Sequence, residues 1–392
     1  MTSYAPPLAG IRVLELGSSV AGPAAGRLLA DLGAEVLKIE PADGDALRTW
    51  GPPAPDGTSW WFKSHNRNKR FLRFDLHDAD DRATVRRIAL TCDVLVENFR
   101  PGRLAAWGLG YEELRAENPR LVYASISGYG QDGPYRDRVG FGNIAESMSG
   151  LRYVTGFPDR PPLRIGISLA DELAALHCVI GIQAALLARA RDGVGDFVDV
   201  SLLESCVALT QGQIPDYDAL GIVRERAGNM LGATAPSNIY PTRDGKWIAI
   251  GANANSIFRR FAQTIGRPEL ADDPRYLGNR ERTEHAAELD AIVAAWTQTV
   301  DASEADRILA AAEVPAGPVY SVADLAADEQ VRARAIVRHL RDDTGNRIAT
   351  PAPVPRFAAH PTVCDHAARA VGADTAAVLA ELGDSVEPMK RV

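Results

Sequence analysis

The sequence predicts an α/β fold, with a large Rossmann-like parallel-sheet domain and a small α+β domain. Apolar strands alternate with helices as far as residue 127, and this alternation is typical of a parallel sheet with helices on both faces. The character of the chain changes near residue 221, where a hairpin signal precedes three helical segments. The length of 392 residues is sufficient for two or three domains.

The first half of the chain contains a βαβ unit of the usual length, roughly 30 residues. Its helix has Pro23 in the first turn, where proline is favoured, and ends at Gly33. The expected elements are strand 11–16, helix 23–32, strands 35–40 and 70–76, helix 79–91, strand 93–97, helices around Leu104 and Glu113, and strand 121–127.

The second half continues with a long apolar helix from Asp171 and a hairpin whose turn is Asp244-Gly245. The further expected elements are strand 195–201, helix 201–211, hairpin 239–250, helices near 256–265, 282–298 and 303–312, hairpin 335–351 and a last helix from Asp374. The predicted domains are 1–220, the first part of a large α/β domain; 221–330, the small α+β domain; and 331–392, a return to the large domain.

Composition and charge exclude some classes of function. The net charge of −8 argues against a nucleic-acid-binding protein, which would carry a basic excess. Four widely spaced cysteines without a C-x-x-C pair indicate neither a disulfide framework nor a zinc knuckle, so we expect a cytoplasmic protein. No signal peptide is visible, and the most apolar stretch, 169–190, contains Asp171, Glu172 and His177. We therefore expect a buried helix there and no membrane span.

Asp171 is the most informative residue of the chain. Ser168 is the expected N-cap of the apolar helix, which places Asp171 in its first turn. There the helix dipole favours the ionised carboxylate, which could act as a nucleophile at neutral pH. The simpler interpretation is that Asp171 only caps the helix. An apolar run from Leu173 to Leu187 predicts that the rest of the helix is buried.

Loops after the predicted strands suggest ligand binding. The segment 17–23 joins a strand to a helix but lacks G-x-G-x-x-G, and Pro23 removes an N–H group, so a nicotinamide or flavin site is disfavoured. Basic clusters at 66–70 and 98–103 are either a solvated surface or a phosphate site. The small residues 251–255 would let backbone N–H groups approach a substrate oxygen. Neither a metal-binding histidine spacing nor a G-x-S-x-G elbow occurs.

In their order and spacing, these segments resemble the family III CoA-transferases, which include formyl-CoA:oxalate and crotonobetainyl-CoA transferases. The similarity runs from about Pro7 to the C-terminus. The matching stretches are 8–16, Ala21-Gly-Pro, 32–40, Asn66-Arg-Asn-Lys-Arg, Glu97-Asn-Phe-Arg-Pro-Gly, 128–134 and the Asp171 helix.

The resemblance implies that Asp171 is the nucleophile and that the protein is a homodimer of two interlocked rings. The site would then lie between the large domain of one chain and the small domain of the other. It also implies that CoA binds along the first strand–helix connection and the basic loops. The candidate CoA-binding residues are Ser19, Val20, Ala21, Leu72, Arg73, Asn98, Phe99, Arg100 and Arg103.

The expected reaction moves CoA from an acyl-CoA donor to a carboxylic acid through an aspartyl anhydride and an aspartyl-CoA thioester, without a metal or redox cofactor. The segment from Phe141 to Arg152 resembles a branch that uses succinyl-CoA and dicarboxylates. The candidates for oxyanion and substrate binding are Val20 (a Gln in the formate/oxalate enzyme), Phe141, Gly142, Gly251, Arg67, Arg138 and Arg152, of which any of the three arginines could pair with a distal carboxylate.

Two alternatives remain open. The first is a 2-methylacyl-CoA racemase of the same fold, although those enzymes carry a His-Asp pair where this chain has Gly140-Phe-Gly-Asn143. The second is a non-catalytic acyl-CoA-binding protein, for which Asp171 would be dispensable.

Overall fold

The computed structural model describes residues 4–232 and 234–383, which form two compact units. Of these residues, the first unit contains 4–151, 164–221 and 333–383, and the second contains 152–163 and 222–332. The domain boundaries expected after residues 220 and 330 lie close to the unit boundaries in the structure, which follow residues 221 and 332. The structure also assigns 152–163 to the second unit, which the sequence pattern did not indicate.

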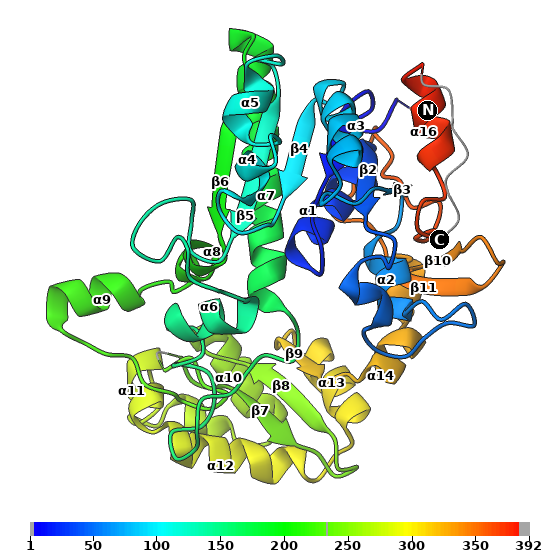
Figure 1. The fold of residues 1–392 in the computed structure, drawn as a ribbon. Helices are drawn as coiled ribbons and strands as arrows, with labels where there is room; N and C mark the ends of the chain where they lie inside the picture. The colour runs from blue at the N-terminus through cyan, green and yellow to red at the C-terminus, as the bar shows by residue number, and fades with distance from the viewer. Residues whose placement is uncertain (1–3, 233, 384–392) are drawn as a thin grey trace. The chain divides into compact units, whose positions relative to one another are not determined.

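A six-stranded parallel sheet forms the centre of the first unit, with strand order β3-β2-β1-β4-β5-β6 (Figure 1). The strands are β1 (Arg12–Glu15), β2 (Glu35–Glu40), β3 (Lys69–Arg73), β4 (Val94–Glu97), β5 (Val122–Ser127) and β6 (Phe197–Ser201). The order reverses between β1 and β4. At such a switch point, the loops after the two strands diverge and leave a crevice where α/β sheets bind ligands.

Helices cover both faces of this sheet, as the alternation of elements predicts. The helices of the first unit are α1 (Ala21–Asp31), α2 (Trp60–His65), α3 (Ala79–Leu90), α4 (Arg103–Ala106), α5 (Tyr111–Arg115), α6 (Gly142–Met148), α7 (Leu169–Asp192), α8 (Leu202–Val207), α9 (Gln213–Leu220) and α16 (Thr375–Glu381). Successive strand residues point to opposite faces. Val13 therefore packs with the core of α1 and α7, whereas Leu14 packs with Val85 and Ile88 of α3.

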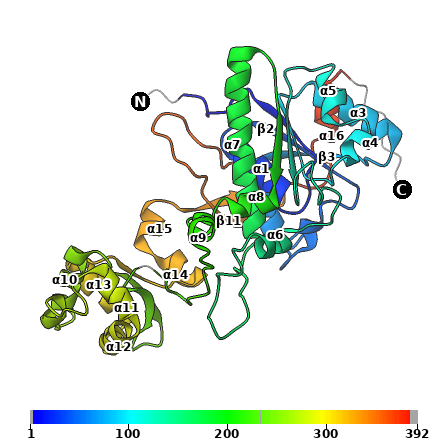
Figure 2. The same cartoon turned by 90° about the vertical axis from the view of Figure 1, so that its left-hand side faces the viewer.

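The long helix α7 has one buried face and one exposed apolar face. Ala174, Cys178 and Ile182 pack against the sheet and α1, and Figure 2 shows α7 running along this layer. On the exposed face, Ile180 and Leu187 are 62% and 75% exposed. The expectation that the whole apolar run is buried is therefore wrong for that face. By length and composition alone α7 could cross a membrane, and its buried face packs against the sheet and α1.

The second unit contains an antiparallel sheet in the order β7-β8-β9, with its own apolar core. Its elements are β7 (Ser237–Pro241), β8 (Trp247–Gly251), α10 (Asn255–Thr264), α11 (Asn279–Glu284), α12 (Ala286–Thr297), α13 (Ala302–Ala311), β9 (Ala316–Pro318) and α14 (Val322–Ala327). The hairpin turn is at Asp244-Gly245, as expected, and Gly245 has φ +74°. The helix expected over 282–298 is divided at His285, whose backbone is not helical.

The chain then returns to the first unit through α15 (Glu329–Ala333) and a hairpin of β10 (Val337–Arg341) and β11 (Arg347–Pro351). Two short 3₁₀ helices, Ala46–Thr49 and Pro268–Ala271, complete the elements of the described residues. The sequence pattern did not predict α2, α6, α9, α14 or α15. Each has eight residues or fewer, too few for a clear helical period.

Candidate active site

Asp171 lies in the first turn of α7, three residues after the N-cap Ser168, as expected. The Ser168 side chain makes no capping hydrogen bond, so its predicted capping contact is absent. Asp171 lines a pocket of about 220 Å³. The loops after β1, β4 and β5 supply most of the pocket wall, so the carboxylate faces the edge of the sheet where ligands of this fold bind.

Burial raises the pKa of Asp171 to about 6, and the neighbouring charges of Glu146 and Glu172 act in the same direction. The helix-dipole argument alone predicted an easily ionised group, and desolvation outweighs it here. At pH 7 a carboxyl with this pKa is still ionised in roughly ten molecules for each protonated one. Asp171 is therefore a desolvated carboxylate that is available as a nucleophile at neutral pH.

The start of α6 lies directly against this carboxylate. A β-carbon built on Gly142 would collide with Oδ2 of Asp171, so the backbone approaches as closely as it does only because residue 142 is glycine. As the first residue of α6, Gly142 has an N–H group without an intrahelical acceptor. Glu146, one turn further along α6, is 3% exposed and accounts for part of the raised pKa of Asp171.

The connection from β1 to α1 forms another wall of the pocket. Ser19, Val20 and Ala21 all line it, and Val20 is the N-cap of α1 without a side-chain capping bond. The first-turn N–H groups of a helix have no intrahelical acceptor, which makes them suitable partners for an oxyanion or a carbonyl. Pro23 has no N–H group, so Ala21 and Gly22 are the residues that supply them.

Most of the predicted site residues that belong to the first unit meet in this one pocket. They are Asp171, Ser19, Val20, Ala21, Asn98, Phe99, Arg100, Arg138 and Phe141, with Gly142 adjoining Asp171. Asn98 also fixes the neighbouring turn, because its side chain accepts from Ser18 N and donates to Ser18 O, each at 2.9 Å.

Other predicted residues lie elsewhere in the first unit. Leu72 is a fully buried core residue, and Arg73 is exposed on β3, with its N–H group bonded to Thr375. Neither lines the pocket of Asp171. Arg103 stacks on the ring of Trp107 at 5.2 Å, which places it beside a second pocket.

The three candidate arginines have different environments. Arg67 is 1% exposed, and its guanidinium donates to both carboxylate oxygens of Asp31 and, at 2.7 Å, to Thr350. The guanidinium of Arg67 is therefore already paired in the core and does not face a substrate carboxylate. Arg138 lines the pocket of Asp171, stacks near the rings of Tyr129 and Tyr135, and has no ion pair among the described residues.

Arg152 and Gly251 belong to the second unit, so the structure does not place them against Asp171. Gly251 ends β8, and its N–H group donates to the carbonyl of Pro315 at 2.9 Å. This N–H group is therefore already paired. The expectation that N–H groups near Gly251 bind an oxyanion stays a prediction.

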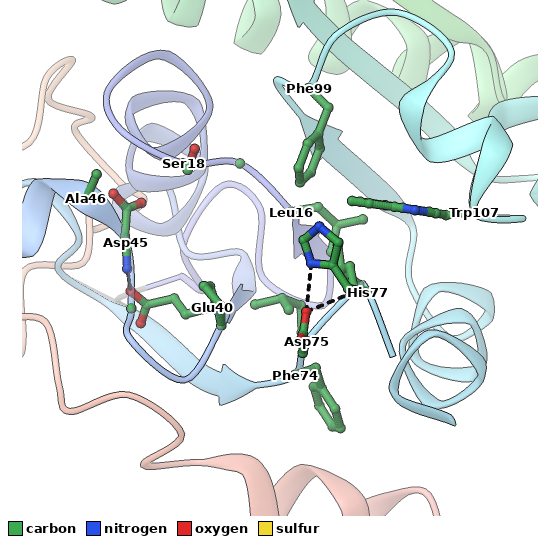
Figure 3. Close-up of a pocket in the computed structure, with 15 residues that line it drawn as sticks. Leu16, Ser18, Glu40, Asp45, Ala46, Phe74, Asp75, His77, Phe99 and Trp107 are labelled. Atoms are coloured by element: carbon green, nitrogen blue, oxygen red, sulfur yellow. Dashed lines mark hydrogen bonds and ion pairs between the residues drawn. The ribbon is translucent and has the colours of Figure 1, made fainter. Parts of the chain in front are cut away.

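A second pocket has a volume of about 270 Å³, and Figure 3 shows the residues that line it. Phe99 and His77 meet the ring of Trp107 edge-on, at 5.7 and 5.3 Å between centroids. The remaining wall is mostly apolar, which suits a flat heteroaromatic group. Ser18 and Phe99 line both pockets, so the two form neighbouring parts of one groove.

Several residues of the site escaped the sequence analysis. Trp107 and His77 line the second pocket, Glu146 influences Asp171, and Asp45 and His65 hold the β1–α1 turn. The only available signal was for Asp45, which follows the carboxyl end of a predicted strand. The others are brought together by tertiary packing.

Comparison with known proteins places this geometry in a family. A sequence profile of CoA-transferase family III matches residues 8–375. The chain is 46% identical to a succinyl-CoA–D-citramalate CoA-transferase of Chloroflexus aurantiacus, over 97% of this chain and 96% of that protein. It is 40% identical to a succinate–glutarate CoA-transferase of Agrobacterium fabrum, over 89% and 88%. The crystal structure of a CAIB/BAIF family protein from Brucella suis matches with a TM-score of 0.87 and 36% identity, over 97% of this chain and 100% of that one.

Proposed function

This chain belongs to CoA-transferase family III, and we propose that it moves CoA from succinyl-CoA to a dicarboxylic acid. The relatives named for succinyl-CoA and for citramalate or glutarate support this choice of substrates. The observation that carries the proposal is the position of Asp171, a desolvated carboxylate at one part of a groove whose neighbouring part is an aromatic pocket.

The groove suits an acyl-CoA in one orientation. The adenine ring would bind in the aromatic pocket that Phe99 and Trp107 line, with Arg103 close to the phosphates. The pantetheine arm would then pass Ser18 and Phe99, which line both pockets. This orientation brings the thioester to Asp171.

Asp171 would act as a covalent nucleophile. Its carboxylate attacks the thioester carbonyl of the donor and expels CoA thiolate, which leaves a mixed anhydride on Asp171. The thiolate then attacks the aspartyl carbonyl and releases the donor acid, giving an aspartyl-CoA thioester. The acceptor carboxylate attacks that thioester, and the same steps in reverse produce the new acyl-CoA and free Asp171. Each step exchanges one acyl bond for another of similar energy, so no step carries the whole barrier.

Each tetrahedral intermediate carries an oxyanion, for which we assign the Gly142 N–H group and those at the start of α1 as donors. The close approach of Gly142 to Asp171 supports this assignment. Apolar contacts from Val20 and Phe141 would keep water away from the anhydride, which would otherwise hydrolyse.

Arg138 is the best candidate for pairing with the distal carboxylate of the acceptor. It shares a pocket with Asp171 and has no carboxylate partner among the described residues, whereas Arg67 is committed to Asp31. A buried distal carboxylate needs such a partner, because an unpaired charge is strongly unfavourable in a desolvated site.

We also propose a cytoplasmic homodimer. The apolar side chains of Leu176, Ile180 and Leu187 on the exposed face of α7 suit a protein interface. All four cysteines are free thiols, as in a reducing compartment.

The test is a transfer assay with succinyl-CoA and a panel of carboxylic acids, read by mass spectrometry. Asp171→Asn should abolish exchange and retain the fold, and an acyl-CoA should make only the wild-type protein sensitive to hydroxylamine. Glu172→Gln, which alters the next carboxyl of the same helical turn, is the matched control and should keep measurable exchange. An Asp171→Asn protein with more than a few per cent of the wild-type rate would refute the role of Asp171. Rapid α-deuterium exchange of a 2-methylacyl-CoA without acceptor would instead support a racemase.

A further inference from the structure

Ser19 has an unusual backbone conformation for its residue type. Its φ is +63°, in the left-handed region that favours glycine. For a residue with a side chain, this conformation is sterically unfavourable and persists only where the surroundings impose it. Ser19 lines the pocket of Asp171 and immediately precedes Val20, the N-cap of α1. Its conformation therefore sets the direction in which the α1 N-terminus meets the pocket.

Side chains from three other segments hold this turn. Asn98, after β4, forms two hydrogen bonds with the backbone of Ser18, and His65 of α2 lies 3.2 Å from the Val20 carbonyl. Burial lowers the pKa of His65 to about 3, so the ring is neutral and its Nε2 tautomer can donate. Between these contacts, Ser19 N lies 3.0 and 3.1 Å from the two carboxylate oxygens of Asp45.

Asp45 is itself rigidly held. It is 4% exposed, accepts from Leu47 N at 2.9 Å and pairs with Lys38 Nζ at 3.0 Å. Lys38 also donates to Glu15 and to the carbonyl of Gly17, each at 2.9 Å. Burial opposes a charge at Asp45, but the ammonium of Lys38 and the two N–H donors hold its pKa below the usual value. Asp45 is therefore an ionised carboxylate, held in place by Leu47 and Lys38, whose two oxygens both face Ser19 N.

We propose that Asp45 is a positioning residue that holds Ser19 in its left-handed conformation and so aims the α1 N-terminus at the pocket of Asp171. The predicted effect on the rate of CoA transfer rests on the proposed transferase function. The predicted effect on the conformation of the Ser19 turn does not. Asp45 forms one wall of the groove as well, and it touches the Ser19 N–H group directly, so the two possible effects of replacing it must be separated.

Two neighbouring residues make this separation possible. Glycine adopts φ +63° without the steric cost, so Ser19→Gly should make the turn much less dependent on Asp45. Glu15 belongs to the same buried charge cluster, with Lys38 at 2.9 Å and Lys69 at 2.7 Å, and its carboxylate partners are these two lysines and not the Ser19 backbone. Glu15→Gln therefore removes the same formal charge as Asp45→Asn and is its matched control.

The kinetic test is a double-mutant cycle on kcat/KM for CoA transfer. Asp45→Asn should lower kcat/KM by roughly 10- to 100-fold in the wild-type background, as a misplaced catalytic backbone does. In the Ser19→Gly background the same substitution should cost no more than about threefold. An equal cost in both backgrounds would overturn the proposal, because Asp45 would then act by touching the ligand or by general stability. Asp45→Glu, which keeps the charge opposite Lys38 but moves the oxygens, should give the same pattern and serves if Asp45→Asn does not fold.

Amide hydrogen exchange provides a readout that does not depend on catalysis. In Asp45→Asn, exchange should become faster in the peptide that spans residues 16–22, and in Glu15→Gln it should stay close to that of the wild type in this peptide. Unchanged exchange in Asp45→Asn, or an equal increase in Glu15→Gln, would overturn the positioning role. If the wild-type protein showed no CoA transfer, only the proposed function would fail, and this measurement would still decide the role of Asp45.

Discussion

The α-carbon of Gly142 lies so close to the carboxylate of Asp171 that no β-carbon fits between them. The two residues come from helices α6 and α7, so the start of α6 packs directly against the candidate nucleophile. Glycine is therefore required at position 142 for space, because its own φ is not in the left-handed region.

Replacing Gly142 by alanine should displace Asp171 from the pocket. We expect kcat/KM for CoA transfer to fall by about 100-fold or more, since small displacements of reacting groups have effects of that size. Gly166→Ala is the control, because a β-carbon there meets no atom within 4 Å. Steady-state kinetics and thermal unfolding of both variants check this prediction. Equal kinetic losses in the two variants would contradict it.

The rate of transfer should depend on the ionisation of Asp171. With a pKa of about 6, kcat/KM should rise as pH increases through 6 and level off above it, because only the carboxylate attacks. Glu146→Gln removes a negative charge that raises this pKa, so the midpoint should move to lower pH. Glu329→Gln changes an exposed carboxyl on α15 and should leave the profile in place. A Glu146→Gln midpoint that stays fixed or rises would rule out this coupling.

Asp171 should also reduce the stability of the folded protein at neutral and higher pH. Its folded pKa of about 6 lies above the ordinary 3.8, so folding favours the protonated form. The stability that the folded state gains by holding this proton is fully present below pH 3.8. It is lost as pH rises through 6. Asp171→Asn should therefore raise the free energy of unfolding by about 1–3 kcal/mol at pH 8, and by less at about pH 4.5. Urea unfolding at both values is the measurement, and a variant equally destabilised at both would contradict the prediction.

Arg138 should determine the preference for dicarboxylates. Loss of a charge-assisted bond of about 1.5–3 kcal/mol in Arg138→Gln predicts a fall of roughly 10- to 150-fold in kcat/KM for glutarate. The value for butyrate, which has no distal carboxylate, should change far less. Arg120→Gln, at an exposed position that bonds the Gly193 carbonyl, is the control. Parallel losses for both acids would show that Arg138 does not read the distal carboxylate.

Trp107 should contribute to binding of the CoA nucleotide and not to the chemical step. Base–aromatic contacts are worth about 1–3 kcal/mol, so Trp107→Leu should raise KM for the acyl-CoA by roughly 5- to 100-fold. The value of kcat should stay within about threefold, because the pocket of Trp107 does not include Asp171. Trp60→Leu, in α2 and outside both pockets, should leave KM unchanged. A loss confined to kcat would place Trp107 in the chemistry instead.

Much of the fold could be predicted because its signals are local. The alternation of strands and helices gave the parallel sheet, Asp244-Gly245 gave a hairpin turn, and the apolar run after Ser168 gave α7 with Asp171 in its first turn. The family resemblance, now shown, added the transferase class. These features depend on residues close together in the chain, where period, capping and turn chemistry act.

Only the tertiary structure decided how the chemical groups are tuned. Burial and two glutamates raise the pKa of Asp171 against the helix dipole, and packing commits Arg67 to Asp31 while leaving Arg138 beside Asp171. The N–H group of Gly251, in a segment where the sequence had suggested oxyanion donors, is bonded to the carbonyl of Pro315. Desolvation and pairing depend on groups far apart in the chain, so a sequence can indicate which residue types are present, but only the folded structure shows which of them are buried, paired or free.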